Sequence, residues 1–190
     1  RIVYSGESIE VKNNDVELEL WQDGFELREK IPVYIAQDGS FSAKLFDGEY
    51  KLTMLQGDGP WVSTADTVTI NLNGYAEVDF EVEPYYILNN VEISNSSGDI
   101  NAVFDVEEIA GGRDIEFVAL YVGTTTIIDN IFNDGNSTTA VGAAGDLPGE
   151  SLTFTLGGDL AERDYIFTRI GVKTVGVTDL IFSPVQKIEL

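Results

Sequence analysis

Carboxylates are the most abundant reactive side chains in this sequence of 190 residues, which has 33 Asp and Glu against 11 Lys and Arg. Two carboxylates are enough for acid–base hydrolysis of a glycosidic bond. The sequence has no histidine and no cysteine, which excludes Ser-His-Asp triads, thiolate nucleophiles and the usual zinc ligand sets. The acids alternate with apolar residues, so we expect them on solvated strand faces rather than in a cleft. We therefore expect a protein that is not an enzyme and uses no cofactor.

Aromatic side chains offer a second kind of chemistry, because their faces stack on sugar rings while nearby carboxylates and amides bind the hydroxyls. Trp61 lies in a loop, 56–66, that also holds Asp58, and its indole is either a glycan platform or a plug at the end of a sandwich. Trp21 follows Leu20 in an alternating segment and is therefore expected to point outward. The candidate ligand-binding residues are Trp61, Asp58 and Trp21.

A polar stretch at residues 123–151 has two interpretations. It either contains short strands or is a functional loop, and we favour strands because long structureless loops are uncommon in compact domains. The stretch gathers oxygen ligands, but they miss the EF-hand spacing and its closing Glu. We therefore expect a solvated polar turn rather than a calcium site at Asp129, Asn130, Asn133, Asp134 and Asn136. We expect no metal site elsewhere in the chain.

The elements that must position these residues show a hydrophobic period of two, which is typical of strands with one buried face. Turn dipeptides such as Asp47-Gly48 and Asn73-Gly74 separate the alternating segments and favour tight hairpins. The sequence therefore predicts an all-β protein made of sandwiches. The expected strands are Asp15–Trp21, Phe41–Leu45, Tyr50–Met54, Val68–Leu72, Ala76–Val82, Ile100–Val106 and Ile115–Tyr121.

A domain boundary is expected at Glu83-Pro84, because proline cannot donate to a central ladder and a new apolar segment starts at Tyr85. We expect two β-sandwich domains in tandem, 1–83 and 84–190, with Tyr85 and Tyr86 packed between them. The formal net charge of −22 repels phosphate backbones and anionic bilayers, so nucleic acid is not an expected partner.

Three groups of motifs resemble known families. The segments Gln37–Phe41 and Phe46–Leu52 resemble the "DG-x-F … G-x-Y" signature of prealbumin-like or carboxypeptidase-regulatory sandwiches. Leu160–Val172 and Phe182–Val185 resemble the last strands of fibronectin type III (Ig-like) domains, which would make Tyr165 a corner tyrosine. With Gly59-Pro60-Trp61 and Val82–Tyr86 added, the chain resembles a Bacteroidetes family of outer-surface lipoproteins of unknown function, found beside starch-utilisation-type (Sus-type) glycan-uptake proteins.

This resemblance implies a function and a location, and it supplies no catalytic residue. The implied function is a non-catalytic cell-surface accessory that binds polysaccharide. The alternative is a structural spacer or interaction module that docks onto an outer-membrane transporter complex. The implied location is outside the cell, on the outer membrane, through a lipid anchor. Because the sequence starts at Arg1 and its only methionine is Met54, we expect the signal peptide and anchoring cysteine to lie upstream.

Overall fold

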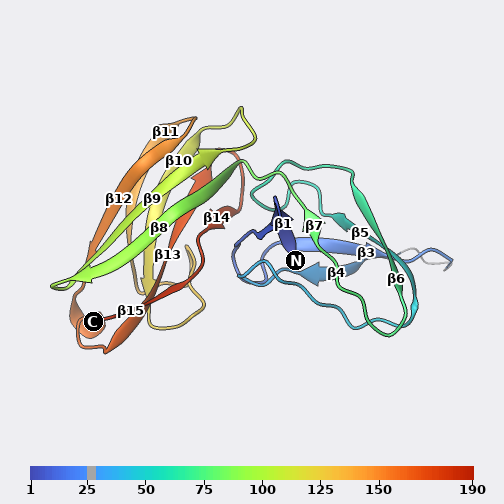
Figure 1. Ribbon diagram of the computed structural model, residues 1–190, viewed down its shortest axis with the longest axis horizontal. Helices are drawn as coiled ribbons and strands as arrows, with labels where there is room; N and C mark the ends of the chain where they lie inside the picture. Colours follow the sequence, from blue (N-terminus) through green and yellow to red (C-terminus); the bar gives the residue numbers. More distant parts are fainter. Residues whose placement is uncertain (25–28) are drawn as a thin grey trace.

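The computed structural model of the protein describes residues 1–24 and 29–190. It consists almost entirely of β-strands, arranged in two bodies that lie side by side (Figure 1). Their sheets form two β-sandwiches in tandem, which confirms the predicted fold class. None of the helical segments in the described part of the chain has the length and apolar character needed to cross a bilayer.

The first domain is a sandwich of two unequal layers. The larger sheet has the order β4-β3-β5-β6 and the smaller has the order β2-β1-β7, in which β1 and β7 are parallel. Alternate residues of the larger sheet, including Leu18, Leu20 and Leu52, face the smaller layer and are buried. The strands are β1 (Ile2–Tyr4), β2 (Glu7–Ser8), β3 (Glu17–Trp21), β4 (Ile31–Tyr34), β5 (Gly48–Met54), β6 (Thr67–Leu72) and β7 (Phe80–Glu81).

The second domain is a sandwich of longer strands. Three strands form the sheet β12-β9-β8, and the facing sheet has the order β11-β10-β13, with both β14 and β15 paired to β13. Phe104, Leu120 and Ile170 lie between the two sheets and are fully buried. The elements are β8 (Tyr86–Ser96), β9 (Asp99–Glu108), β10 (Ile115–Gly123), β11 (Gly135–Ala143), β12 (Leu147–Thr155), the 3₁₀ helix η1 (Gly158–Leu160), β13 (Tyr165–Thr174), β14 (Leu180–Phe182) and β15 (Gln186–Glu189).

Two of the expected strands differ from the structure. Phe41–Leu45 is not a strand, and of Ala76–Val82 only Phe80–Glu81 belongs to one. In the first segment Phe41 and Leu45 do turn toward the core, so the apolar pattern reports burial correctly. The prediction of a strand is wrong because the backbone there has no neighbouring strand with which to form a ladder.

The stretch 123–151 contains strands, as we favoured. It holds β11 and the first half of β12. Between β10 and β11 the chain forms a loop that is not the solvated polar turn we expected, since Asp129 is only 1% exposed while Ile131 and Phe132 are exposed. The Asp129 carboxylate accepts hydrogen bonds from the backbone N–H groups of Ile131 and Phe132 at 2.7 and 2.8 Å. Asp134 accepts from the N–H and hydroxyl of Thr124. These carboxylates therefore serve the backbone of the loop. Among the described residues, no group of three or more acidic side chains is placed to hold a metal ion.

Candidate functional site

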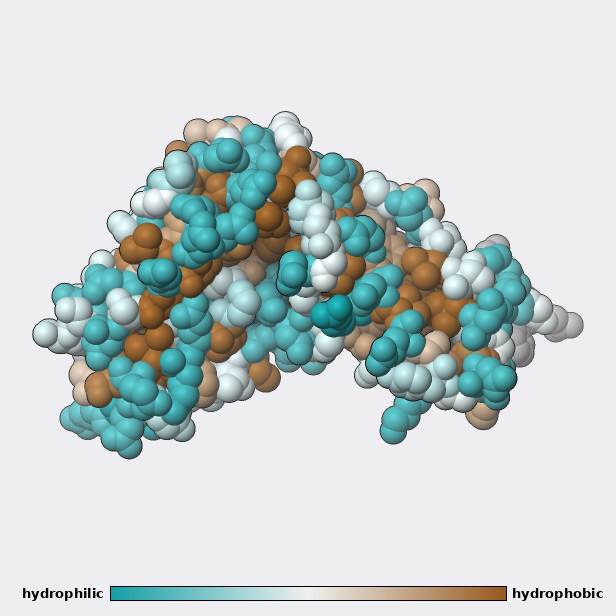
Figure 2. Space-filling view, in the orientation of Figure 1, coloured by the Kyte–Doolittle hydropathy of each residue, from teal (hydrophilic) through white to brown (hydrophobic). Residues whose placement is uncertain are grey.

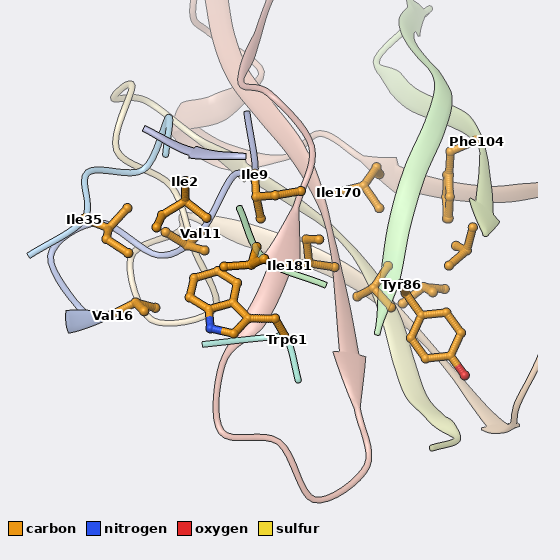
Figure 3. Close-up of a cluster of buried hydrophobic side chains, with 14 of the residues drawn as sticks. Ile2, Ile9, Val11, Val16, Ile35, Trp61, Tyr86, Phe104, Ile170 and Ile181 are labelled. Atoms are coloured by element: carbon orange, nitrogen blue, oxygen red, sulfur yellow. The ribbon is translucent and has the colours of Figure 1, made fainter. Parts of the chain in front are cut away.

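Trp61, the first of the candidate site residues, lies at the junction of the two domains. The segment around it pairs with the start of the second domain through an isolated bridge between Trp61 and Pro84, and the Val62 N–H donates to the Glu83 carbonyl at 2.9 Å. The Trp61 side chain is only 3% exposed, and Figure 3 shows its indole among Val16, Ile181 and other apolar side chains. An indole packed in this way presents no face to a sugar. The structure therefore shows that Trp61 plugs the end of the sandwich and does not form a glycan platform.

Asp58 is placed to support the fold. Its Oδ2 accepts the backbone N–H of Glu17 at 2.7 Å, which ties the loop to the first residue of β3. Burial, followed by the nearby carboxylate of Asp179, raises the pKa of Asp58, while the hydrogen bond from Glu17 opposes this shift. The carboxylate is therefore committed to the backbone and is not displayed for a ligand.

Three tyrosines have distinct positions. Tyr86 is fully buried and its hydroxyl donates to the Arg113 carbonyl, while the Tyr85 N–H donates to the Pro60 carbonyl at 3.1 Å across the junction. Tyr165 is not a buried corner tyrosine, since its side chain is 43% exposed. In β13 the core positions are Ile166 and Ile170, so the alternation turns Tyr165 to the outside, where its ring lies 4.0 Å from Lys187 Nζ.

Trp21 lies on the outer face of the larger sheet of the first domain, as its phase relative to Leu20 predicts. It is the last residue of β3 and is half-buried. Its direct cross-strand partner on β5 is Lys51, and on the same face Thr53 of β5 is paired with Thr67 of β6. These four side chains line an open hollow of about 460 Å³. We call Trp21, Lys51, Thr53 and Thr67 the Trp21 shelf.

Neighbouring charges hold the Trp21 shelf in place. The indole Nε1–H donates to Glu19 Oε2 at 3.2 Å, and Lys51 Nζ lies 2.6 Å from Asp23 Oδ2. Lys30 bonds the other oxygen of Glu19 at 2.8 Å. Hydrogen bonds to Glu17 and Glu19 raise the pKa of Lys30 above its ordinary value. The hydrogen bond to Glu19 thus fixes one edge of the indole. The Thr53 hydroxyl donates to the Glu19 carbonyl at 3.5 Å and can still accept, while Thr67 contributes a hydroxyl that can donate and accept.

Lys51, Thr53 and Thr67 were not among the candidates from the sequence. The signal that could have found them is parity, because residues spaced by two share one face of a strand. Lys51 and Thr53 alternate with the core residues Tyr50, Leu52 and Met54. What parity alone could not give is the register that brings Lys51 opposite Trp21, since register depends on the pairing of whole strands.

Comparison with known proteins places the chain in a family. Residues 1–83 match the N-terminal domain of a protein of unknown function (DUF3823), and residues 86–187 match a domain of unknown function (DUF3823_C). The chain belongs to the DUF3823 family. No protein with curated information matches it.

Solved structures of DUF3823 proteins share the whole architecture. One from Parabacteroides merdae is 34% identical, with a TM-score of 0.92, and the match covers 100% of this chain and 96% of that one. Another, from Bacteroides ovatus, is 30% identical over 100% of this chain and 96% of that chain, with a TM-score of 0.90. A protein of Bacteroides uniformis, provisionally described as carbohydrate-binding, is 18% identical over 98% of this chain and 93% of that chain, with a TM-score of 0.75. At that identity the likeness shows the fold alone.

Proposed function

We propose that this DUF3823 protein is a non-catalytic, carbohydrate-binding accessory protein of the cell surface, and that the Trp21 shelf is its sugar-binding site. The observation that carries the proposal is the outward-facing indole of Trp21, set directly opposite Lys51 and beside the hydroxyls of Thr53 and Thr67. An aromatic face bordered by fixed polar groups is the combination that sugar recognition requires.

The shape of the shelf favours a polymer over a monosaccharide. The hollow is open and lies on the face of a sheet, so it surrounds no ligand on all sides. A polysaccharide can cross such a surface, stacking one ring on Trp21 and placing hydroxyls against the two threonines. The ion pairs at Lys51 and Glu19 hold these side chains before the ligand arrives, which reduces the ordering cost of binding.

Two further lines support the carbohydrate proposal. The fold is shared with the Bacteroides uniformis protein that is provisionally described as carbohydrate-binding, and two similar DUF3823 proteins of known structure come from Parabacteroides merdae and Bacteroides ovatus. The resemblance to surface lipoproteins that neighbour Sus-type glycan-uptake proteins adds the proposed location, which is the outer membrane, through a lipid anchor. Sus-type outer-membrane proteins are the proposed partners.

The spacer or docking module remains the second candidate, and the domain junction favours it. Backbone hydrogen bonds cross the junction from Tyr85 to Pro60 and from Phe182 to Glu10, at 3.1 and 3.0 Å. Apolar side chains of both domains belong to one buried cluster. Such a junction holds the two sandwiches in a fixed orientation, as a spacer requires.

The test of the carbohydrate proposal is affinity electrophoresis of the whole chain against plant, mucosal and microbial polysaccharides. Where the wild type is retarded, Trp21→Ala should lose roughly thirtyfold in affinity, about 2 kcal/mol, which is common for an aromatic hot spot. Tyr165→Ala is the matched control, because it removes an exposed ring of the other domain. A wild type that binds no polysaccharide, or a Trp21→Ala variant that binds as well as Tyr165→Ala, would overturn the proposal.

A further inference from the structure

The outer face of the larger sheet of the first domain carries a second aromatic ring besides that of Trp21. Tyr34 is the last residue of β4 and is 50% exposed. The residue before it, Val33, is buried and is paired with the buried Leu18 of β3. Because side chains of a strand alternate between its two faces, Tyr34 points to the same outer face as Trp21.

The strand register fixes the spacing of these two aromatic residues. Tyr34 is paired with Glu17, the first residue of β3, and Trp21 is the last residue of the same strand. With a rise of about 3.4 Å per residue and about 4.8 Å between neighbouring strands, the Cα atoms of Tyr34 and Trp21 lie roughly 14 Å apart. A single sugar ring cannot reach from one aromatic ring to the other. A glycan that uses both rings must therefore be an oligosaccharide or a polymer.

The surface between Trp21 and Tyr34 is polar and is held by ion pairs. Glu17 and Glu19 are alternate residues of β3 and face outward with Trp21. Lys30 Nζ lies 2.7 Å from Glu17 Oε1 and 2.8 Å from Glu19 Oε1. The lysine side chain remains 38% exposed. Its ammonium group and the two carboxylates therefore form a fixed floor of donors and acceptors that can bind sugar hydroxyls.

The charges of this face indicate that the glycan is neutral. Lys30 is paired with two carboxylates and Lys51 with that of Asp23, so both ammonium groups are already neutralised before a uronate could bind them. Hydrophilic side chains cover much of the visible surface of both domains (Figure 2), and the whole chain has 33 acidic residues against 11 basic ones. The field of such a protein repels a polyanionic polysaccharide.

We propose that the sugar-binding site extends from the Trp21 shelf to Tyr34 and takes a neutral, extended polysaccharide chain. One sugar unit stacks on Trp21 and another stacks on Tyr34, because an aromatic face suits the apolar face of a sugar ring. The units between them lie over Lys30, Glu17 and Glu19. This extended site rests on the proposed carbohydrate function, and it requires a ligand longer than a disaccharide.

The first test measures the binding of the whole chain to three neutral polysaccharides, which are mixed-linkage β-glucan, glucomannan and arabinoxylan, and to the acidic polygalacturonate. The wild type should bind at least one neutral polymer, and polygalacturonate at least about tenfold more weakly. Tyr34→Ala should weaken binding of the neutral polymer about tenfold, as loss of an aromatic contact does. Tyr34→Phe should bind like the wild type, because it keeps the ring face. Tyr75→Ala is the matched control, since Tyr75 is 77% exposed and lies outside the strands.

The second test uses ligand length to separate the extended site from the Trp21 shelf alone. The probes are the disaccharide and the hexasaccharide made by hydrolysis of the neutral polysaccharide that the wild type binds, and binding is followed by calorimetry. The wild type should bind the hexasaccharide at least about tenfold more tightly than the disaccharide. Tyr34→Ala should remove this difference, because the second aromatic contact is lost, whereas Trp21→Ala should weaken both probes.

The outcomes distinguish failure of the extended site from failure of the carbohydrate function. If Trp21→Ala loses affinity while Tyr34→Ala binds like Tyr75→Ala, the extended site is overturned and the proposed function stands. The same holds if the wild type prefers polygalacturonate, if the two probe lengths bind equally, or if Tyr34→Phe loses as much affinity as Tyr34→Ala. A wild type that binds none of the four polymers also overturns the extended site, and the wider polysaccharide panel then decides the carbohydrate function.

Discussion

Gly59 and Asp179 are joined across the two domains: the backbone N–H of Gly59 donates to Oδ2 of the buried Asp179 at 3.0 Å, over a separation of 120 residues. Gly59 has φ +88°, and a Cβ atom there would lie 2.3 Å from ring carbons of Trp61. Only glycine permits both this backbone conformation and this close approach. The indole is therefore clamped at the junction, where the apolar cluster continues from Val16 of the first domain to Ile181 of the second (Figure 3).

The clamped position of Trp61 predicts a large effect on stability. Trp61→Ala should lower the free energy of unfolding by about 3–5 kcal/mol, because it leaves a cavity in a packed core. Urea unfolding of the whole chain measures this difference. Trp61→Phe is the control: it keeps most of the ring and removes an indole N–H that has no hydrogen-bond partner among the described residues, so its loss should be smaller. Equal stability of Trp61→Ala and the wild type would contradict the packing described here.

The burial of Trp61 illustrates what the sequence could not decide. Alternation along one strand fixes which side chains share a face. This local rule predicted correctly that Trp21, next to the buried Leu20, points outward. Trp61 lies in a loop, where no period applies. Its neighbours in space include Ile181, far away in the chain, so its exposure depends on how the two domains pack rather than on nearby residues.

The strands of the stretch 123–151 were hard to place for a different reason. β11 has the sequence Gly-Asn-Ser-Thr-Thr-Ala-Val-Gly-Ala and is exposed along most of its length, so it carries no apolar alternation. In β12 the register shifts between Leu147 and Glu150, which breaks the period of two. Edge strands and irregular strands are held by backbone pairing, and that pairing leaves little trace in side-chain hydrophobicity.

A second set of contacts at the junction joins Glu10 to Arg169. Glu10 forms an isolated antiparallel bridge with Phe182, and the Phe182 ring lies 3.7 Å from the guanidinium carbon of Arg169. Burial is the main cause that raises the pKa of Glu10, to about 7. The carboxylate of Asp38 adds to this shift and the charge of Arg169 opposes it. Asp129 and Tyr121 also face Arg169, whose pKa is lowered to about 10, chiefly by burial.

The raised pKa of Glu10 predicts that stability falls as pH rises. Its ordinary value is 4.5 and its value in the folded protein is about 7, so between these pH values the folded state binds more protons than the unfolded state. By linkage, this contribution to stability is fully present below about pH 4.5 and is lost as pH rises through about 7. The melting temperature of the wild type should therefore be higher at the acidic end of this range than above it.

Glu10→Gln isolates this contribution, because glutamine does not titrate. The melting temperature of the variant should change less across the same pH range than that of the wild type. Asp58 and Asp179 also have raised pKa values, chiefly through burial, and they will leave a residual slope in both proteins. Identical slopes for the variant and the wild type would show that Glu10 does not titrate in this range.

Residues 84–190 should fold without the first domain, but with reduced stability. The core of the second sandwich is its own, since Phe104, Leu120 and Ile170 are contributed by its own sheets, and the fragment has the size of a small domain. Its separation from the first domain uncovers Ile181 and Phe182, which are each 3% exposed in the whole chain. We therefore expect one cooperative heat transition at a lower temperature than that of the whole chain.

The matched experiment records the heat transition of residues 84–190 again, after addition of a separately produced fragment of residues 1–83. If the junction alone holds the domains together, the first fragment should raise the melting temperature of the second in a saturable way, because it binds only the folded form. Trp61→Ala in the added fragment should abolish the rise, since that ring supplies the centre of the contact. A fragment 84–190 without any cooperative transition would show instead that the two sandwiches fold as one unit, through the core that Trp61 completes.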